Sequence, residues 1–119
     1  MRRLEHLTIE ELKEGQDRIV HLRGSADILS LQSVQELLDR CNKEQVRCLF
    51  IDLSATRFIN SPVWAVITLY ARKQKSRVAV IGMTERIRGS FAMMGLHKEL
   101  YAFSDLEVAR RELGIKQDS

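Results

Sequence analysis

Residues 46–53 form a continuous apolar and β-branched run, and this run constrains the fold more than any other stretch of the chain. The run is too short for a typical helix, and apolar side chains at successive positions are typical of a strand buried on both faces. Shortly afterwards, apolar residues recur at helical spacing, at Val63, Val66, Ile67 and Tyr70. A buried strand that leads into an amphipathic helix predicts an α/β sheet.

The remaining segments continue the alternation of strands and helices. Residues 1–17 fit either an edge strand or a helical turn capped at Thr8, and the turn signal at residues 14–17 favours a hairpin. Residues 24–27 are expected to form a loop. The hydrophobic patterns then predict strands at 18–23, 77–82 and 100–103, and helices at 31–41, 62–75, 84–94 and after Ser104.

We therefore expect an α/β fold with a mixed sheet of about five strands, a mainly parallel core and about four helices. With 119 residues, the chain is long enough for one compact domain and too short for two. We assign residues 1–119 to a single domain and expect residues 114–119 to form a flexible tail.

Composition and charge argue against several classes of function. The net charge is +3, and the basic residues are spread along the chain without a block, so we expect no binding to nucleic acid. The sequence has no apolar stretch typical of a signal peptide or a membrane span, so we expect a cytoplasmic protein that has no membrane partner. Cys41 and Cys48 are expected to be buried apolar residues rather than metal ligands or a disulfide pair.

No catalytic, cofactor-binding or metal-binding motif is recognisable in the sequence. The three histidines, His6, His21 and His97, are scattered, and none has an acidic residue or a cysteine at a ligand spacing. A glycine-rich phosphate loop, a Ser-His-Asp set and a pair of catalytic carboxylates are also missing. We therefore predict a protein that is not an enzyme and that uses no cofactor or metal.

The segment between the central strand and its helix contains residues that favour a helix start. Ser61 is a favoured N-cap residue, and Pro62 suits the first helical position, where its missing N–H is not needed. The first turn of a helix carries unpaired N–H groups. In open α/β sheets, functional sites gather at the edge where the parallel strands end and such helices begin. The junction at residues 58–64 is therefore the predicted functional region.

Several short segments occur together in the order and spacing of a known family. They are Gly24-Ser25-Ala26-Asp27, Ile51-Asp52-Leu53-Ser54 with Phe58-Ile59-Asn60-Ser61, Val78-Ala79-Val80-Ile81-Gly82, and Arg88 with Phe91 and Gly95-Leu96. In these segments the chain resembles STAS domains, and specifically the small single-domain anti-sigma factor antagonists of bacteria. The resemblance spans most of the chain and implies the STAS fold and a protein-binding role without catalysis.

In such antagonists, the helix junction usually reads Asp-Ser-Ser-Gly-Leu or Asp-Ser-Thr-Gly-Leu. The resemblance implies a partner kinase that doubles as the anti-sigma factor, phosphorylates the second hydroxyl residue, and binds only the unphosphorylated antagonist. In this chain, Asn60 replaces the Asp and Ser61 matches the first Ser, whereas Pro62, Val63 and Trp64 occupy the remaining three positions. Because Pro62 stands at the phosphoacceptor position and has no hydroxyl, the usual switch cannot operate at its usual atom.

Three residues near the junction each have two interpretations. Ser61 is either a displaced phosphoacceptor or an N-cap, and the preference of serine for caps favours the second. Trp64 lies at the border of the buried helix face, where it either packs in the core or anchors a partner. Asp27 follows the second strand, where it either contributes to the functional surface or acts as an ordinary turn residue.

We predict a docking module that regulates transcription or signalling by binding an anti-sigma factor or a related serine kinase. The predicted contact residues are Asp27, Asn60, Ser61, Pro62, Val63 and Trp64, and the usual phosphoserine switch is not expected. One alternative is a scaffold subunit that pairs with itself or with other STAS-domain proteins. A second alternative is sensing of a small ligand or nucleotide at the same crevice.

Overall fold

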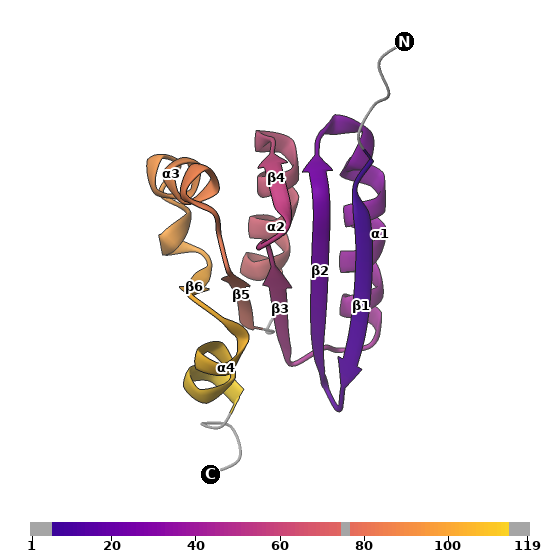
Figure 1. Cartoon of the computed structure of the whole chain (residues 1–119). Coiled ribbons are helices and arrows are strands. Elements are labelled where there is room, and N and C mark those ends of the chain that lie inside the picture. The colour runs from indigo at the N-terminus through magenta and orange to yellow at the C-terminus, as the bar shows by residue number, and fades with distance from the viewer. Residues whose placement is uncertain (1–5, 75–76, 115–119) are drawn as a thin grey trace.

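The computed structural model describes residues 6–74 and 77–114 as a sheet with helices packed against it (Figure 1). The strands are β1 (Thr8–Glu14), β2 (Asp17–Ala26), β3 (Cys48–Asp52), β4 (Thr56–Ile59), β5 (Arg77–Ile81) and β6 (Tyr101–Phe103). The helices are α1 (Leu31–Lys43), α2 (Ser61–Lys73), α3 (Glu85–Met93) and α4 (Leu106–Ala109). Shorter turns are the 3₁₀ segments η1 (Ile28–Ser30) and η2 (Leu96–Lys98), and the π-helical segment η3 (Arg110–Gly114). Within these ranges, no helix is long and apolar enough to cross a membrane.

The strand order is β1-β2-β3-β5-β6, and β4 pairs with the end of β2 beyond β3. β1 runs antiparallel to β2 as the predicted hairpin, and the other pairings are parallel. This arrangement confirms the expected mixed sheet with a mainly parallel core. α1 and α2 lie behind the sheet in Figure 1, and both helices begin at the edge where the parallel strands end.

Alternating side chains on the central strands divide the core between the two faces of the sheet. On one face, Val20, Leu49 and Val80 belong to the larger cluster, which includes the apolar sides of α1 and α2. On the other face, Ile19 and Phe50 pack in a smaller cluster with residues of α4 and η3. Because β3 is buried from both sides, its sequence is a continuous apolar run rather than an alternating one.

The sheet differs from the sequence prediction at the carboxyl end of β2. Residues 24–27 were expected to form a loop, but β2 extends to Ala26 because β4 pairs with it. The register of this pairing shifts between Gly24 and Ser25, and Gly24 has a φ of 101°, a conformation that strongly favours glycine. The sequence pattern does not predict β4, since only Thr56 and Ile59 of its four residues are buried and they do not alternate.

The last helix also begins differently from the prediction. Asp105, rather than Ser104, is the N-cap of α4, and its carboxylate accepts a hydrogen bond from the N–H of Val108 at 2.9 Å. An aspartate is as good a cap as serine, so residue preference alone could not distinguish the two positions. Of the predicted tail, Gly114 ends the π-helical segment, and residues 115–119 lie outside the described residues.

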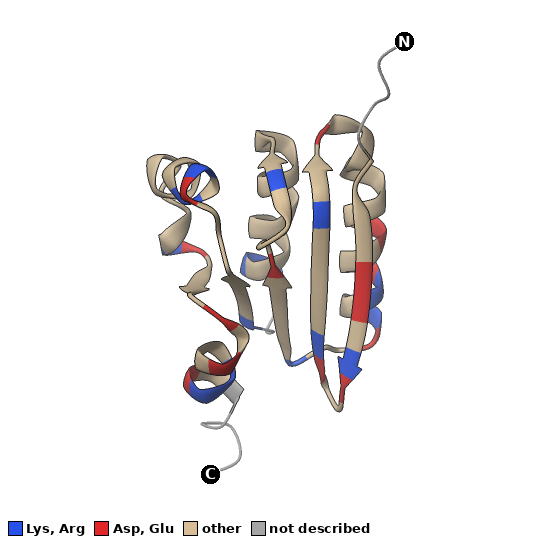
Figure 2. Ribbon diagram, viewed as in Figure 1, with Lys and Arg blue, Asp and Glu red and all other residues tan. Residues whose placement is uncertain are grey.

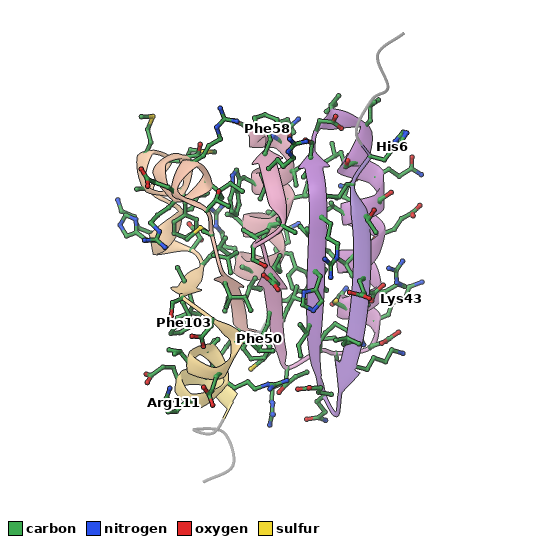
Figure 3. The ribbon with its side chains drawn as sticks, in the orientation of Figure 1. His6, Lys43, Phe50, Phe58, Phe103 and Arg111 are labelled. Carbon is green, nitrogen blue, oxygen red and sulfur yellow. The ribbon has the colours of Figure 1, made fainter. Side chains whose placement is uncertain are left out.

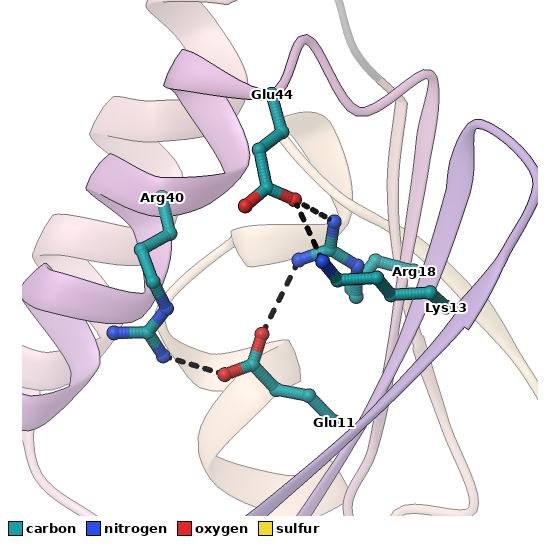
Figure 4. Close-up of polar contacts among 5 residues, drawn as sticks. All are labelled: Glu11, Lys13, Arg18, Arg40 and Glu44. Atoms are coloured by element: carbon teal, nitrogen blue, oxygen red, sulfur yellow. Dashed lines mark hydrogen bonds and ion pairs between the residues drawn. The ribbon is translucent and has the colours of Figure 1, made fainter.

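A cluster of charged residues joins the edge strand β1 to α1 (Figure 4): Glu11, Lys13, Arg18, Arg40 and Glu44. The Arg18 side chain is only 5% exposed, and it donates to Glu11 at 3.2 Å and to Glu44. Burial alone would lower the pKa of Arg18, but the hydrogen bond to Glu44 and the neighbouring charges raise it above its usual value. Arg18 therefore stays charged and links β1, whose side chains are mostly exposed, to the end of α1.

We expect the Arg18→Ala variant to lose about 2–3 kcal/mol of unfolding free energy, because it leaves two carboxylates facing each other without their shared cation. The measurement is urea unfolding followed by circular dichroism. The matched control is Arg23→Ala, since Arg23 pairs with Glu10 where both side chains are 56% exposed. That variant should lose less than about 1 kcal/mol. Equal losses in the two variants would show that the buried cluster has no special role.

Candidate functional site

The junction between β4 and α2 is held by Asn60. The Asn60 side-chain oxygen accepts a hydrogen bond from the N–H of Val63 at 3.1 Å, which makes Asn60 the N-cap of α2. Its own N–H donates to the Ala26 carbonyl at 3.0 Å and so ties the helix start to the end of β2. The prediction that Ser61 is the N-cap is therefore wrong by one residue. Asn and Ser are equally favoured caps, and the extended backbone of Asn60 places the cap there.

Ser61 and Pro62 occupy the first two positions of α2, and both are exposed. Pro62 is therefore the second helical residue rather than the first, although its missing N–H is still outside the regular helical bonding. Within the described residues, the Ser61 hydroxyl has no hydrogen-bond partner, since Asn60 performs the capping. The structure thus leaves the Ser61 hydroxyl accessible, contrary to the expectation that it caps the helix.

Asp27 lies at the same edge of the sheet as Asn60. The parallel pairing of Ala26 with Ile59 aligns the ends of β2 and β4, so the residues that follow each strand are neighbours. The Asp27 carboxylate accepts hydrogen bonds from the N–H of Leu29 at 3.0 Å and from the Ser30 hydroxyl at 3.4 Å. Asp27 therefore organises the η1 turn beside the junction.

Val63 and Trp64, which were predicted to contact a partner, are buried. Their side chains are 0% and 1% exposed, and Trp64 packs edge-to-face against Phe91 of α3 with ring centres 5.7 Å apart. The indole N–H of Trp64 has no hydrogen-bond partner among the described residues. These two residues thus belong to the core, and the interpretation of Trp64 as an exposed anchor is wrong.

Other apolar side chains are exposed around the junction instead. Ile28 and Leu29 on η1 are 58% and 67% exposed. Phe58 at the end of β4, labelled in Figure 3, is 46% exposed. Pro62 on the first turn of α2 is exposed as well. We call Ile28, Leu29, Phe58 and Pro62 the apolar rim, because they lie on η1, the end of β4 and the first turn of α2, which meet at the carboxyl edge of the sheet.

Only part of the apolar rim could be identified from the sequence. Ile28 and Leu29 follow Asp27 in a segment without helical or strand periodicity, so no pattern assigns their side chains to the core. Phe58 and Ile59 are adjacent on a strand, so their side chains point to opposite faces of the sheet. That signal required knowledge of β4, which the sequence pattern does not supply.

A second polar contact lies on the opposite face of the sheet from α1 and α2. His21 Nδ1 is 2.8 Å from Asp52 Oδ2, because the two residues are directly paired in the β2–β3 register. Burial alone would raise the pKa of Asp52, but hydrogen bonds from Ser54 and His21 lower it below its usual value. The sequence spacing of 31 residues between His21 and Asp52 hides this contact from motif analysis.

The described residues contain no group of three or more His, Cys, Asp or Glu side chains arranged to hold a metal ion. Cys41 and Cys48 are buried free thiols, as predicted. Figure 2 shows acidic and basic residues interspersed on β1, β2 and α1, so opposite charges neighbour one another along these elements. At the junction, the described residues that are exposed include the apolar side chains of η1, the end of β4 and the first turn of α2.

Comparison with known proteins identifies the family. The family model described as the STAS domain matches residues 9–109, which is most of the chain. The chain belongs to the STAS domain family. No curated protein gives a significant match to the full sequence.

Several solved structures share this fold. An anti-sigma factor antagonist from Mycobacterium paratuberculosis is 18% identical, with a TM-score of 0.83 over 91% of this chain and 94% of that chain. RsbS from Moorella thermoacetica is 20% identical, with a TM-score of 0.77 over 93% of this chain and 98% of that chain. A putative anti-sigma factor antagonist from Thermotoga maritima is 14% identical, with a TM-score of 0.78 over 88% and 93%. At these identities, the matches establish the fold of this STAS protein.

We expect Trp64→Ala to lower the unfolding free energy by about 3–5 kcal/mol, since it opens a cavity against Phe91 in the core. Phe58→Ala should change it by less than about 1 kcal/mol, because half of the Phe58 ring is already in water. Thermal and urea unfolding of the two variants would measure the difference. A larger loss for Phe58→Ala would mean that Phe58, rather than Trp64, supports the fold.

Proposed function

We propose that this STAS protein is a non-enzymatic docking module that binds an anti-sigma factor or a related serine kinase through the apolar rim. The observation that supports the proposal is the exposure of Ile28, Leu29 and Phe58 beside the start of α2. In the anti-sigma factor antagonists that the chain resembles, this junction carries the regulatory switch. Through such a partner, the protein would regulate transcription or signalling.

The energetics of the rim are adequate for a specific interaction. Full burial of one leucine or phenylalanine side chain contributes about 1.5–3 kcal/mol. Three such side chains, Ile28, Leu29 and Phe58, are each about half or more exposed before binding. Aromatic and aliphatic anchors at the centre of an interface supply most of its binding free energy. Asn60, with its backbone groups already bonded, holds these anchors in place without contributing an anchor itself.

The direct test is affinity capture with the tagged full chain from cells of the source organism, followed by mass spectrometry and by calorimetry with the purified partner. We expect an anti-sigma factor or a serine kinase to be recovered. Leu29→Ser should weaken its binding about tenfold, because an apolar anchor is lost. Recovery of other STAS-domain proteins would favour the scaffold alternative.

The matched control is Leu12→Ser. Leu12 on β1 is 49% exposed and pairs with Ile19 near the start of β2, whereas the rim lies beyond the other end of β2 at Ala26, so its loss should leave binding unchanged. If Leu12→Ser and Leu29→Ser weakened binding equally, the proposed location of the interface would be wrong. If no regulator of either class were captured, the proposed function would be rejected.

We further propose that this docking operates without the phosphoserine switch of the family. A phosphate at a helix start is stabilised by the N–H groups of the first turn. Here Pro62 has no N–H, and the N–H of Val63 already donates to Asn60. Although the Ser61 hydroxyl is exposed, the turn therefore has fewer donors for a phosphate than an ordinary helix start.

Incubation with the captured kinase and ATP, followed by intact-mass measurement, tests this second proposal. We expect no stoichiometric phosphorylation of the native chain. Pro62→Ser should gain one phosphate at residue 62, because it restores both the hydroxyl and the N–H at the family's acceptor position. Pro62→Ala is the control that removes the proline without adding a hydroxyl. One phosphate on Ser61 of the native chain would contradict the proposal.

A further inference from the structure

Two arginines near the start of α3 have no bonding partner among the described residues. Arg86 and Arg88 are exposed, and neither forms an ion pair or a side-chain hydrogen bond with a described residue. Acidic side chains, rather than basic ones, stabilise the start of a helix, so helix stability does not explain this pair. Most other arginines of the described chain are bonded to a carboxylate or to a carbonyl oxygen: Arg18, Arg23, Arg40, Arg47, Arg72, Arg77 and Arg110.

The positive charge of these two arginines is little offset by their neighbours. Glu85 is the only acidic residue of α3. Arg57 on β4 is also exposed, and α3 contacts β4, so basic segments of the two elements neighbour each other in Figure 2. We call Arg57, Arg86 and Arg88 the basic surface.

The basic surface borders the apolar rim. α3 follows β5 and so begins at the carboxyl edge of the sheet, as α2 does. Phe91 of α3 packs against Trp64 near the start of α2, and α3 contacts β4, which carries the exposed rim residue Phe58. A protein docked at the rim would therefore lie beside the basic surface.

The outward face of α3 lies between its two arginines. Ile87 and Phe91 are buried, and a rotation of about 100° per residue places Arg86 and Arg88 on the two sides of Ile87. On α3, Met93 is the only large apolar side chain that is exposed, at 89%. One methionine is too small an apolar face for a helix that binds a membrane, whereas methionine adapts to varied protein surfaces.

We propose that the partner docked at the apolar rim contacts the basic surface with an acidic segment, whose Asp and Glu side chains pair with Arg86 and Arg88. This inference rests on the proposed docking at the rim and adds the charge of the partner. A guanidinium group suits the role because it can bind a carboxylate through two parallel hydrogen bonds. Complementary charges at the edge of an interface mainly raise the association rate, and salt screens them.

The test measures the association rate of the captured and purified partner with the native chain and with the double variant Arg86→Gln/Arg88→Gln. In about 50 mM salt, we expect the rate constant of the double variant to be about tenfold lower. In about 500 mM salt the two rates should converge, because exposed charges are then screened. The melting temperature should stay unchanged or rise, since both arginines oppose the helix dipole.

Arg111→Gln is the matched control. Arg111 is likewise exposed and without an ion pair among the described residues, but it lies at the opposite end of the molecule from Phe58 (Figure 3). This variant should associate with the partner as fast as the native chain does.

The outcomes separate this inference from the proposed function. A partner that binds the rim but associates equally fast with the native chain and the double variant would overturn the inference alone, whereas capture of no regulator would reject both. Equal slowing by Arg111→Gln would also overturn the inference, because the charge would then act without a location. Saturable binding of the native chain to phosphatidylserine vesicles, lost in the double variant, would assign the basic surface to lipid instead.

Discussion

The pairing of β2 with three different strands is the constraint on which the rest of the structure depends. β2 pairs with β1 along one side, with β3 over residues 18–21 of the other side, and with β4 over residues 24–26. Two hydrogen bonds fix the point at which β2 changes its pairing from β3 to β4. The Gly24 N–H donates to the Ala55 carbonyl at 3.0 Å, and the buried Thr56 hydroxyl donates to the Leu22 carbonyl. A buried hydroxyl without such a partner would destabilise the fold. This exchange brings η1 and the start of α2 together.

The same arrangement determines which junction side chains face the core and which face water. Once Asn60 caps α2, the helical periodicity turns Val63 and Trp64 into the core, where Trp64 packs against Phe91, and leaves Ser61 and Pro62 outside. The pleat of β4 likewise buries Ile59 and exposes Phe58. The exposure of the rim side chains is therefore a geometric consequence of a well-filled core, and in the proposed role a substitution on the rim would alter binding without altering the fold.

The fold could be predicted from the sequence where the signal is local. The apolar run at residues 46–53, the alternation at 18–23 and the helical spacing after Ser61 each depend on neighbouring residues, and the strands and helices that they predict are present. The candidate site depends on contacts between distant residues, and there the sequence misplaces the helix cap and expects Trp64 at the surface. β4 exists because β2 pairs with it, and the cap falls on Asn60 because the end of β4 sets its extended backbone. The His21–Asp52 contact likewise requires the strand register.

The proposed docking surface is held in place by bonds within the structure. The first turn of α2 is restrained by the Asn60 cap, by the hydrogen bond from Asn60 to Ala26 and by the fixed φ of Pro62. Because the turn has little conformational freedom to lose on binding, most of the free energy gained by burying apolar side chains would contribute to affinity. To switch off such a surface, a new charge must appear within it. The first turn of α2 lacks a hydroxyl at residue 62, and few of its N–H groups remain to bind a phosphate. In the proposed role, control of the interaction therefore belongs to the abundance or the state of the partner rather than to a modification of this helix start.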